Sequence, residues 1–371
     1  MLLIRNIKLF KGKYLTRANI LISEDGKIVK IYRSMYTNHY FFSRINEIYN
    51  GKERLALPGI IDLHVHFREP GFEYKEDFET GSKAAIAGGT TIVADMPNNN
   101  PRIKTLEDLL MKLRKIKNRS YVDYLLYLEV PDKMEEYDKI IRSDIKPAGI
   151  KVYFYLTNEE NAFLKGNISP HFLYIIHAED SRYIKSSYEC HSYKSFALSR
   201  PNIAEKNAVI KALEMARKGV TIHFTHISTL DAVLEIQKAK KMGLPITADV
   251  TPHHLLLTIE DGEKLGSVAK CYPPLRTELD RRFLINAIEG GIIDAIATDH
   301  APHAPKEKRM DLCRSSAGIA SVQYTFSLIF TLLRKYRISD PRPFLKALSE
   351  NPAKILGLED RGKIAVGYYA D

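Results

Sequence analysis

Eight short apolar segments, separated by stretches with helical spacing, constrain the fold of this chain more than any other feature. The segments are 56–67, 90–96, 122–130, 149–156, 172–179, 220–228, 245–251 and 292–300. Between them, helical spacing of apolar residues is clearest at 76–87, 104–117, 203–218 and 229–242. Strands that alternate with helices are typical of parallel sheets, and eight such units predict a (β/α)8 TIM-like barrel over residues 57–356.

The N-terminal region has a different pattern. Residues 1–56 contain stretches in which apolar and polar residues alternate, namely 2–10, 18–32 and 40–49. This alternation predicts β-strands, and Glu24-Asp25-Gly26 predicts a turn between two of them. We expect a small β-rich domain formed by residues 1–56 and by the C-terminal tail, residues 357–371.

Composition narrows the class of protein. No apolar run approaches the ~20 residues of a membrane span, and the N-terminal MLLIRNIKLF is too short and too charged for a signal peptide. The three cysteines, Cys190, Cys271 and Cys313, are far apart and show no CxxC spacing, so we expect no disulfide framework and no thiolate metal site. We therefore predict a cytoplasmic protein without a membrane partner.

The charge of the chain leaves one alternative open. The formal net charge is +10, which raises the question of nucleic-acid binding. The lysines are spread among acidic residues, however, and no nucleic-acid-binding motif accompanies them. We expect no nucleic-acid partner, and DNA binding without hydrolytic activity would support the alternative.

Polar side chains stand at the C-terminal ends of the predicted strands, where barrel enzymes gather their functional groups. His64 and His66 are one residue apart on a strand, so their side chains point to the same face and could form half of a zinc site. An isolated pair of this kind is often two hydrogen-bonded core histidines. Here His177 and His226 recur at later strand ends, which favours metal binding.

The motifs HVHFREPG, AGGTTIVADMPNNNP, GIKVY, HAE, THIS and ATDHAPH resemble, in this order, those of the class I dihydroorotases of the amidohydrolase superfamily. The resemblance covers residues 55–371 and includes the closing NPAKILGL. It implies a zinc-dependent dihydroorotase, which reversibly cyclises N-carbamoyl-L-aspartate to L-dihydroorotate in pyrimidine biosynthesis.

The resemblance also implies two zinc ions per chain. His64, His66 and Asp299 would hold one ion, and His177 and His226 would hold the other. Lys151 would bridge the two ions as a carboxylated lysine, together with a hydroxide, which places the chain in the lysine-type branch of the family. A carbamate is an anionic ligand, whereas an ammonium group would be repelled by two dications. The alternative for Lys151 is a lysine that reaches outward from the end of a buried strand.

Catalytic and substrate roles follow from the same resemblance. Asp299 would move the proton from the attacking hydroxide to the departing ring nitrogen. Arg68, Asn98 and His303 would bind the substrate, with the planar guanidinium of Arg68 on the exocyclic carboxylate. Asn98 could instead form a turn. Allantoinases and hydantoinases resemble the chain as well, but they generally lack this arginine, and they remain the alternative activities.

The chain departs from the family pattern in three places. Tyr272 stands where the family often has an asparagine that contacts the substrate ring. Residues 309–321 match loosely, and we expect a mobile substrate loop there. The chain ends at GYYAD, where the family usually continues, so we expect the C-terminal part of the small domain to be incomplete. A non-catalytic subunit that scaffolds aspartate transcarbamoylase is a further alternative, and a homodimer or association with that enzyme are the assemblies considered.

Overall fold

The computed structural model describes residues 1–32, 45–166, 168–185 and 191–371. The chain divides into two compact units, one formed by Met1–Ile61 with Ile338–Asp371 and the other by Asp62–Arg337. His39, Cys190 and part of the predicted strand 40–49 lie outside the described residues.

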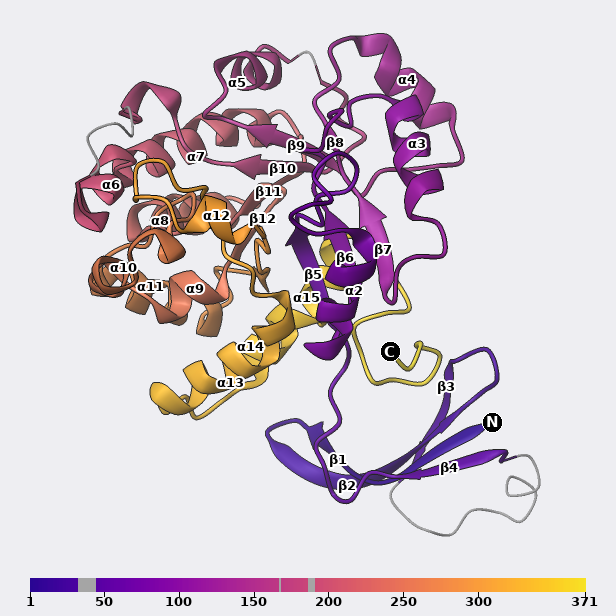
Figure 1. Ribbon diagram of the computed structural model, residues 1–371. Coiled ribbons are helices and arrows are strands. Elements are labelled where there is room, and N and C mark those ends of the chain that lie inside the picture. Colours follow the sequence, from indigo (N-terminus) through magenta and orange to yellow (C-terminus); the bar gives the residue numbers. More distant parts are fainter. Residues whose placement is uncertain (33–44, 167, 186–190) are drawn as a thin grey trace. The chain divides into compact units, whose positions relative to one another are not determined.

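The first unit contains a four-stranded sheet in the order β3-β2-β1-β4 (Figure 1). Its strands are β1 (Leu2–Lys11), β2 (Tyr14–Ile22), β3 (Ile28–Tyr32) and β4 (Glu47–Asn50). The predicted turn is present, with Gly26 at a φ of 81°. The tail joins the sheet edge, because Ile28 N donates to Tyr368 O at 2.8 Å and Ala370 N donates to Gly26 O at 2.9 Å. The expected β-rich part is thus present.

The boundary between the units differs from the predicted one. Helices α14 (Arg342–Leu348) and α15 (Glu350–Ile355) group with the first unit, although the sequence placed residues 338–356 in the barrel. Two contacts explain this. Leu345 of α14 lines the same cleft as Phe10 of β1. The tail passes so close to α15 at Gly362 that a side chain there would begin 2.9 Å from Ala353 Cβ. Such contacts join distant parts of the chain, so helical periodicity cannot reveal them.

The second unit is a closed parallel barrel, as predicted (Figure 1). Its strands are β5 (Ile60–Val65), β6 (Thr90–Asp95), β7 with β8 (Asp123–Leu126, Leu128–Glu129), β9 (Ile150–Tyr153), β10 (Tyr174–His177), β11 (Ile222–Thr225), β12 (Ile246–Val250) and β13 (Ala295–Ile296). Tyr127 N donates to Asp95 O at 3.0 Å where β7 passes into β8, and His66 N donates to His300 O at 2.8 Å to close the ring.

Helices connect most of these strands. The longer ones are α2 (Phe78–Ala87), α3 (Leu106–Ile116), α4 (Met134–Arg142), α5 (Thr157–Leu164), α7 (Asn202–Arg217), α8 (Leu230–Lys241), α11 (Glu278–Glu289) and α13 (Thr325–Lys335). Asp77, Thr105 and Thr277 begin α2, α3 and α11 with reciprocal capping boxes. The four predicted helical intervals are confirmed.

Shorter helices occupy the connections at the carboxyl ends of the strands. They are α6 (Tyr193–Ser199), α9 (Pro252–Leu256), α10 (Ile259–Leu265) and α12 (Pro305–Lys308). Helix α6 lies in the long connection between β10 and α7. Within the described residues, no helix combines the length and the apolar character needed to cross a membrane.

Candidate metal centre

The barrel brings the predicted site residues to one end. His64 lies on β5, Lys151 on β9 and His177 at the end of β10. His226 directly follows β11, and Asp299 lies three residues beyond the end of β13. All five side chains are buried. Because the strands are parallel, their carboxyl ends meet at one rim, which joins residues up to 235 positions apart in the sequence.

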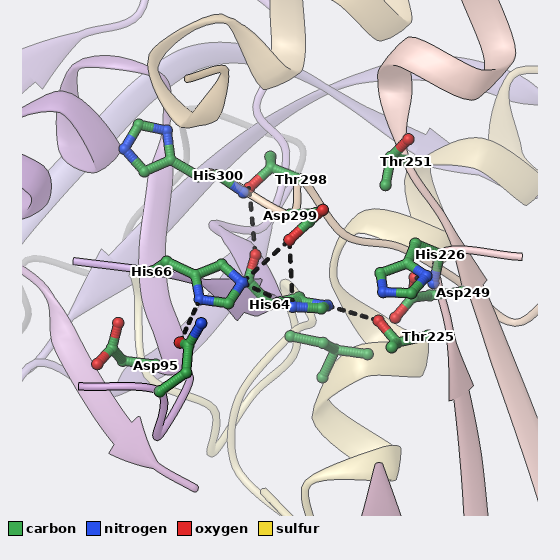
Figure 2. Close-up of polar contacts among 12 residues, drawn as sticks. His64, His66, Asp95, Thr225, His226, Asp249, Thr251, Thr298, Asp299 and His300 are labelled. Carbon is green, nitrogen blue, oxygen red and sulfur yellow. Dashed lines mark hydrogen bonds and ion pairs between the residues drawn. The ribbon is translucent and has the colours of Figure 1, made fainter. Parts of the chain in front are cut away.

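His64, His66 and Asp299 form a compact triad (Figure 2). Asp299 Oδ1 lies 3.2 Å from His64 Nε2 and 3.1 Å from His66 Nε2, and the two Nε2 atoms are 3.1 Å apart. Burial lowers the pKa of both rings, so they are neutral at pH 7. Three donor atoms that converge in this way suit a tetrahedral metal ion with N and O ligands.

The second nitrogen of each ring has its own partner (Figure 2). His66 Nδ1 donates to Asn98 Oδ1 at 2.7 Å, which leaves the lone pair of His66 Nε2 free to bind a metal ion. His64 Nδ1 lies 2.6 Å from Thr225 Oγ1. Metal-binding histidines usually have such a partner, because it fixes the tautomer and the ring orientation. The triad therefore fits a metal ion, and the amide oxygen of Asn98 is engaged by His66.

Lys151, His177 and His226 form a second group beside the triad. The His226 ring centroid lies 4.5 Å from that of His177 and 5.3 Å from that of His64. Lys151 Nζ and His226 Nδ1 are buried and have no hydrogen-bond partner among the described residues. Burial lowers the pKa of Lys151 to about 7, although nearby carboxylates act in the opposite direction. A neutral amine is the form that reacts with CO2, so this group also fits the predicted metal site.

Glu179 and Arg200, which the sequence did not indicate, orient His177. His177 Nε2 lies 2.6 Å from Glu179 Oε2, and Arg200 Nη2 donates to the same oxygen at 2.6 Å. Burial alone would raise the pKa of Glu179, but Arg200 and His177 outweigh it and hold the pKa below its usual value. The ionised carboxylate keeps the proton on His177 Nε2 and leaves Nδ1 as a ligand atom. The available signal was the position of Glu179, two residues after His177 and just beyond the end of the buried strand β10.

Three site residues have strained backbones. Arg68, His226 and Asp299 have φ angles of 64°, 43° and 47°, in the left-handed region that residues with a Cβ rarely adopt. Strain of this kind costs about 1–3 kcal/mol per residue and clusters at functional sites. It supports the view that this rim was selected for chemistry as well as for folding.

Among the described residues, the buried cation Arg68 has no carboxylate in ion-pair contact, although Asp299, Asp95 and Glu76 favour its charge from a greater distance. Its side chain is 8% exposed, Nε donates to Pro302 O at 3.0 Å, and Nη2 lies 3.2 Å from His303 Nε2. In the described part of the chain, no carboxylate pairs with it. Lys75, which the sequence did not indicate, contacts His303 on its other ring nitrogen, with Nζ 3.1 Å from His303 Nδ1. Burial and these two cations lower the pKa of His303 to about 4.

The remaining sequence hypotheses concern the rim loops. Tyr272 packs against Arg200, whose guanidinium lies 3.9 Å from the ring centroid. The loop 309–321, which we expected to move, is anchored by Lys270, whose Nζ donates to three of its carbonyl oxygens, on Leu312, Cys313 and Ser315. His300 Nε2 contacts Glu76 at 2.7 Å, so this histidine supports the rim rather than entering the triad.

His253, His254 and Cys271 form another group with donor atoms within 4.8 Å of one another. His254 is already engaged on both ring nitrogens, since Nδ1 contacts Thr251 Oγ1 at 2.8 Å and Nε2 donates to Pro273 O at 3.2 Å. The group is therefore a poorer metal site than the triad.

Comparisons with known proteins identify the family of the chain. The sequence profile of the amidohydrolase family matches residues 55–371. An allantoinase from Bacillus velezensis is 36% identical over 379 residues, which cover 96% of this chain and 80% of that protein. A dihydroorotase from Methanosarcina mazei is 34% identical over 396 residues, which cover 99% of this chain and 84% of that protein.

Solved structures give the same fold. An L-hydantoinase from Arthrobacter aurescens superposes with a TM-score of 0.90 at 24% identity and covers 100% of this chain and 85% of its own. The family profile extends over the whole predicted barrel, and the relatives align over nearly the full length of the chain. The protein belongs to the amidohydrolase family.

Proposed function

We propose that this chain is a metal-dependent dihydroorotase, which interconverts L-dihydroorotate and N-carbamoyl-L-aspartate. The observation that carries the proposal is the buried guanidinium of Arg68, which has no carboxylate partner among the described residues. A buried charge without a partner is costly, so such an arginine is expected to pair with an anionic ligand. Dihydroorotate carries a carboxylate, whereas hydantoin and allantoin carry none.

The geometry around Arg68 supports a carboxylate pocket. Pro302 O accepts a hydrogen bond from Arg68 Nε and orients the guanidinium, which lies beside the His303 ring and offers a planar pair of donors that suits a carboxylate. Lys75 adds positive charge on the far side of His303, although Glu307 neutralises part of it at 3.1 Å. His303 accepts a hydrogen bond from Lys75 at Nδ1 and donates one from Nε2 to Ala317 O, so its ring is fixed beside Arg68. The pocket therefore offers a carboxylate the charge of Arg68 and part of the charge of Lys75.

His64, His66 and Asp299 would hold one metal ion, and His177, His226 and a carboxylated Lys151 would complete a second site. When bound, zinc ions at such a site polarise an amide carbonyl and bring the pKa of water to about 7. The ions themselves and their number are part of the proposal. The fit rests on the converging nitrogen atoms, on the unpartnered Lys151 Nζ and on the fixed tautomers of the histidines.

Asp299 is proposed to move the proton. Burial alone would raise its pKa, but the adjoining His66, His253 and Lys151 outweigh this effect and keep the pKa below its ordinary value. Asp299 is therefore ionised at neutral pH and can accept a proton from attacking water. The same carboxyl would then deliver that proton to the ring nitrogen that leaves, and the reverse order serves cyclisation.

Asn98 would also hold the substrate. Its Oδ1 accepts a hydrogen bond from His66, which leaves the amide nitrogen as a donor to the substrate carboxylate. The loop 309–321 contributes indirectly, because Ala317 O lies 2.9 Å from His303 Nε2 and so fixes that ring beside Arg68. Substrate binding would then involve loops from both ends of the barrel sequence.

Allantoin hydrolysis is the second candidate. The allantoinase of Bacillus velezensis is 36% identical to this chain, which is comparable with the dihydroorotases. Tyr272 also stands in place of the asparagine that dihydroorotases often have. This alternative leaves the buried guanidinium of Arg68 without a function, and for that reason we rank it second.

A side-by-side assay separates the candidates. Purified protein is given L-dihydroorotate, hydantoin and allantoin at equal concentration, and N-carbamoyl-L-aspartate in the reverse direction. We expect ring opening of dihydroorotate and cyclisation of carbamoyl aspartate to exceed the other rates by at least about tenfold, the effect of one charge-assisted hydrogen bond. Preference for allantoin or hydantoin would refute the proposal. The cytoplasmic location and the assemblies considered above stay predictions.

A further inference from the structure

The side chain of Tyr153 has a buried hydroxyl that no described residue bonds. Tyr153 ends β9, two residues after Lys151, and is 5% exposed. Native proteins leave few buried polar atoms without a hydrogen bond, and each exception needs an explanation. Lys151 Nζ and His226 Nδ1, which are also unpartnered, are accounted for by the proposed metal site. The hydroxyl of Tyr153 is not.

The position of Tyr153 points to the substrate. In the parallel pair of β9 and β10, which lie side by side in Figure 1, Tyr153 stands in register with His177. Their ring centroids are 6.3 Å apart, and Lys151 Nζ lies 5.3 Å from the Tyr153 ring centroid. Tyr153 is also within electrostatic range of Arg68. The phenol therefore lies among the groups proposed to hold the metal ions and the substrate carboxylate.

The backbone of Tyr153, in contrast to its hydroxyl, is firmly held. Tyr153 N donates to Glu159 Oε2 at 2.9 Å, and Arg102 Nη2 donates to Glu159 Oε1 at 2.9 Å. Tyr155 packs near the Tyr153 ring, with centroids 5.6 Å apart and planes at 61°. A rigid side chain with a free polar atom is the arrangement expected of a preorganised binding group.

We propose that Tyr153 donates a hydrogen bond to a carbonyl oxygen of the cyclic amide substrate and so contributes to binding and specificity. This inference rests on the proposed function for the identity of the ring. A phenol is a neutral hydrogen-bond donor and so suits an uncharged carbonyl. With Arg68 on the carboxylate and the metal ligands at the scissile amide, the other ring carbonyl is the acceptor left to this hydroxyl.

The variant Tyr153→Phe removes the hydroxyl and keeps the ring. We expect kcat/KM to fall by about 10- to 100-fold, mostly through a higher KM, because the bond is made to bound substrate as well as to the transition state. The metal content should stay the same. Without ligand, the melting temperature should be unchanged or higher, because a hydroxyl with no protein partner is lost.

The control is Tyr174→Phe. Tyr174 is also buried, at the start of β10, and its hydroxyl donates to Ser169 O at 2.8 Å. This variant should lower the melting temperature and leave kcat/KM at the wild-type value, the opposite of Tyr153→Phe.

Two results would overturn the inference. The first is a wild-type kcat/KM for Tyr153→Phe, and the second is a loss of ligand-free stability as large as that of Tyr174→Phe, which would mean that the hydroxyl has a protein partner. The kinetics are measured on whichever cyclic amide the wild-type protein opens fastest. If that substrate is not dihydroorotate, the proposed function fails while the test of Tyr153 still stands.

Discussion

Substitution of Arg68 separates the chemistry of the substrate pocket from the strain of its backbone. Arg68→Ala and Arg68→Gly both remove the guanidinium, and with it the bond to Pro302 O at 3.0 Å. The two variants differ only in whether residue 68, whose backbone has a φ of 64°, carries a Cβ atom. The kinetic effect of the two variants should therefore be the same, and their stabilities should differ.

The kinetic magnitude follows from the proposed contact. A hydrogen bond between a guanidinium and a carboxylate contributes about 1.5–3 kcal/mol, which corresponds to about 10- to 150-fold in kcat/KM. We expect both variants to lose this much with dihydroorotate and to keep their metal content. Arg68→Lys should recover only part of it, because lysine keeps the charge and loses the planar pair of donors. With hydantoin, which has no carboxylate, the loss should disappear.

The stability magnitude follows from the backbone. A residue with a Cβ pays about 1–2 kcal/mol in the left-handed conformation, whereas glycine adopts it freely. Arg68→Gly should therefore melt about 2–4 °C higher than Arg68→Ala. The measurements are steady-state kinetics on both substrates and calorimetric melting of the three variants. Near-normal turnover of dihydroorotate by Arg68→Ala would refute the pocket, and equal melting temperatures for the alanine and glycine variants would refute the argument from strain.

Further predictions concern the metal centre and the response to pH. Asp299→Asn should fold and lose at least about 100-fold in both directions, since it can no longer accept a proton; near-normal rates would move that role elsewhere. Lys151→Ala should abolish activity and reduce bound zinc from about two ions per chain to about one, and the native mass of the wild-type protein should include one added carboxyl group that this variant lacks. The pKa of His303 is lowered to about 4, so the unfolded chain binds this proton more readily than the folded one. The contribution of a neutral His303 to the free energy of unfolding should be complete above about pH 6.5 and lost as the pH falls toward 4. Denaturation midpoints of wild type and His303→Asn measure this contribution. A difference between the two midpoints that stays constant over this pH range would contradict the prediction.

The barrel and most of its helices were predictable because their signals are local. Buried strands such as 149–156 form short apolar runs, and helices such as 203–218 repeat their apolar residues with the helical period. The observed β9 (Ile150–Tyr153) and α7 (Asn202–Arg217) lie at these positions. The candidate ligands were also predictable as a group, because parallel strands bring their carboxyl ends together whatever their separation in sequence.

Only the tertiary structure decided which side chains support that group. Lys75 meets His303, 228 residues away, and Asn98 meets His66 rather than only the substrate. Glu179 and Arg200 face His177 although nothing periodic distinguishes them. Helices α14 and α15 likewise joined the first unit through contacts that no local pattern records. The geometry of the backbone imposes the strand and helix periods, so these can be recognised in a single sequence. Hydrogen-bond partners depend on which loops come into contact after folding, and these contacts leave no periodic pattern in the sequence.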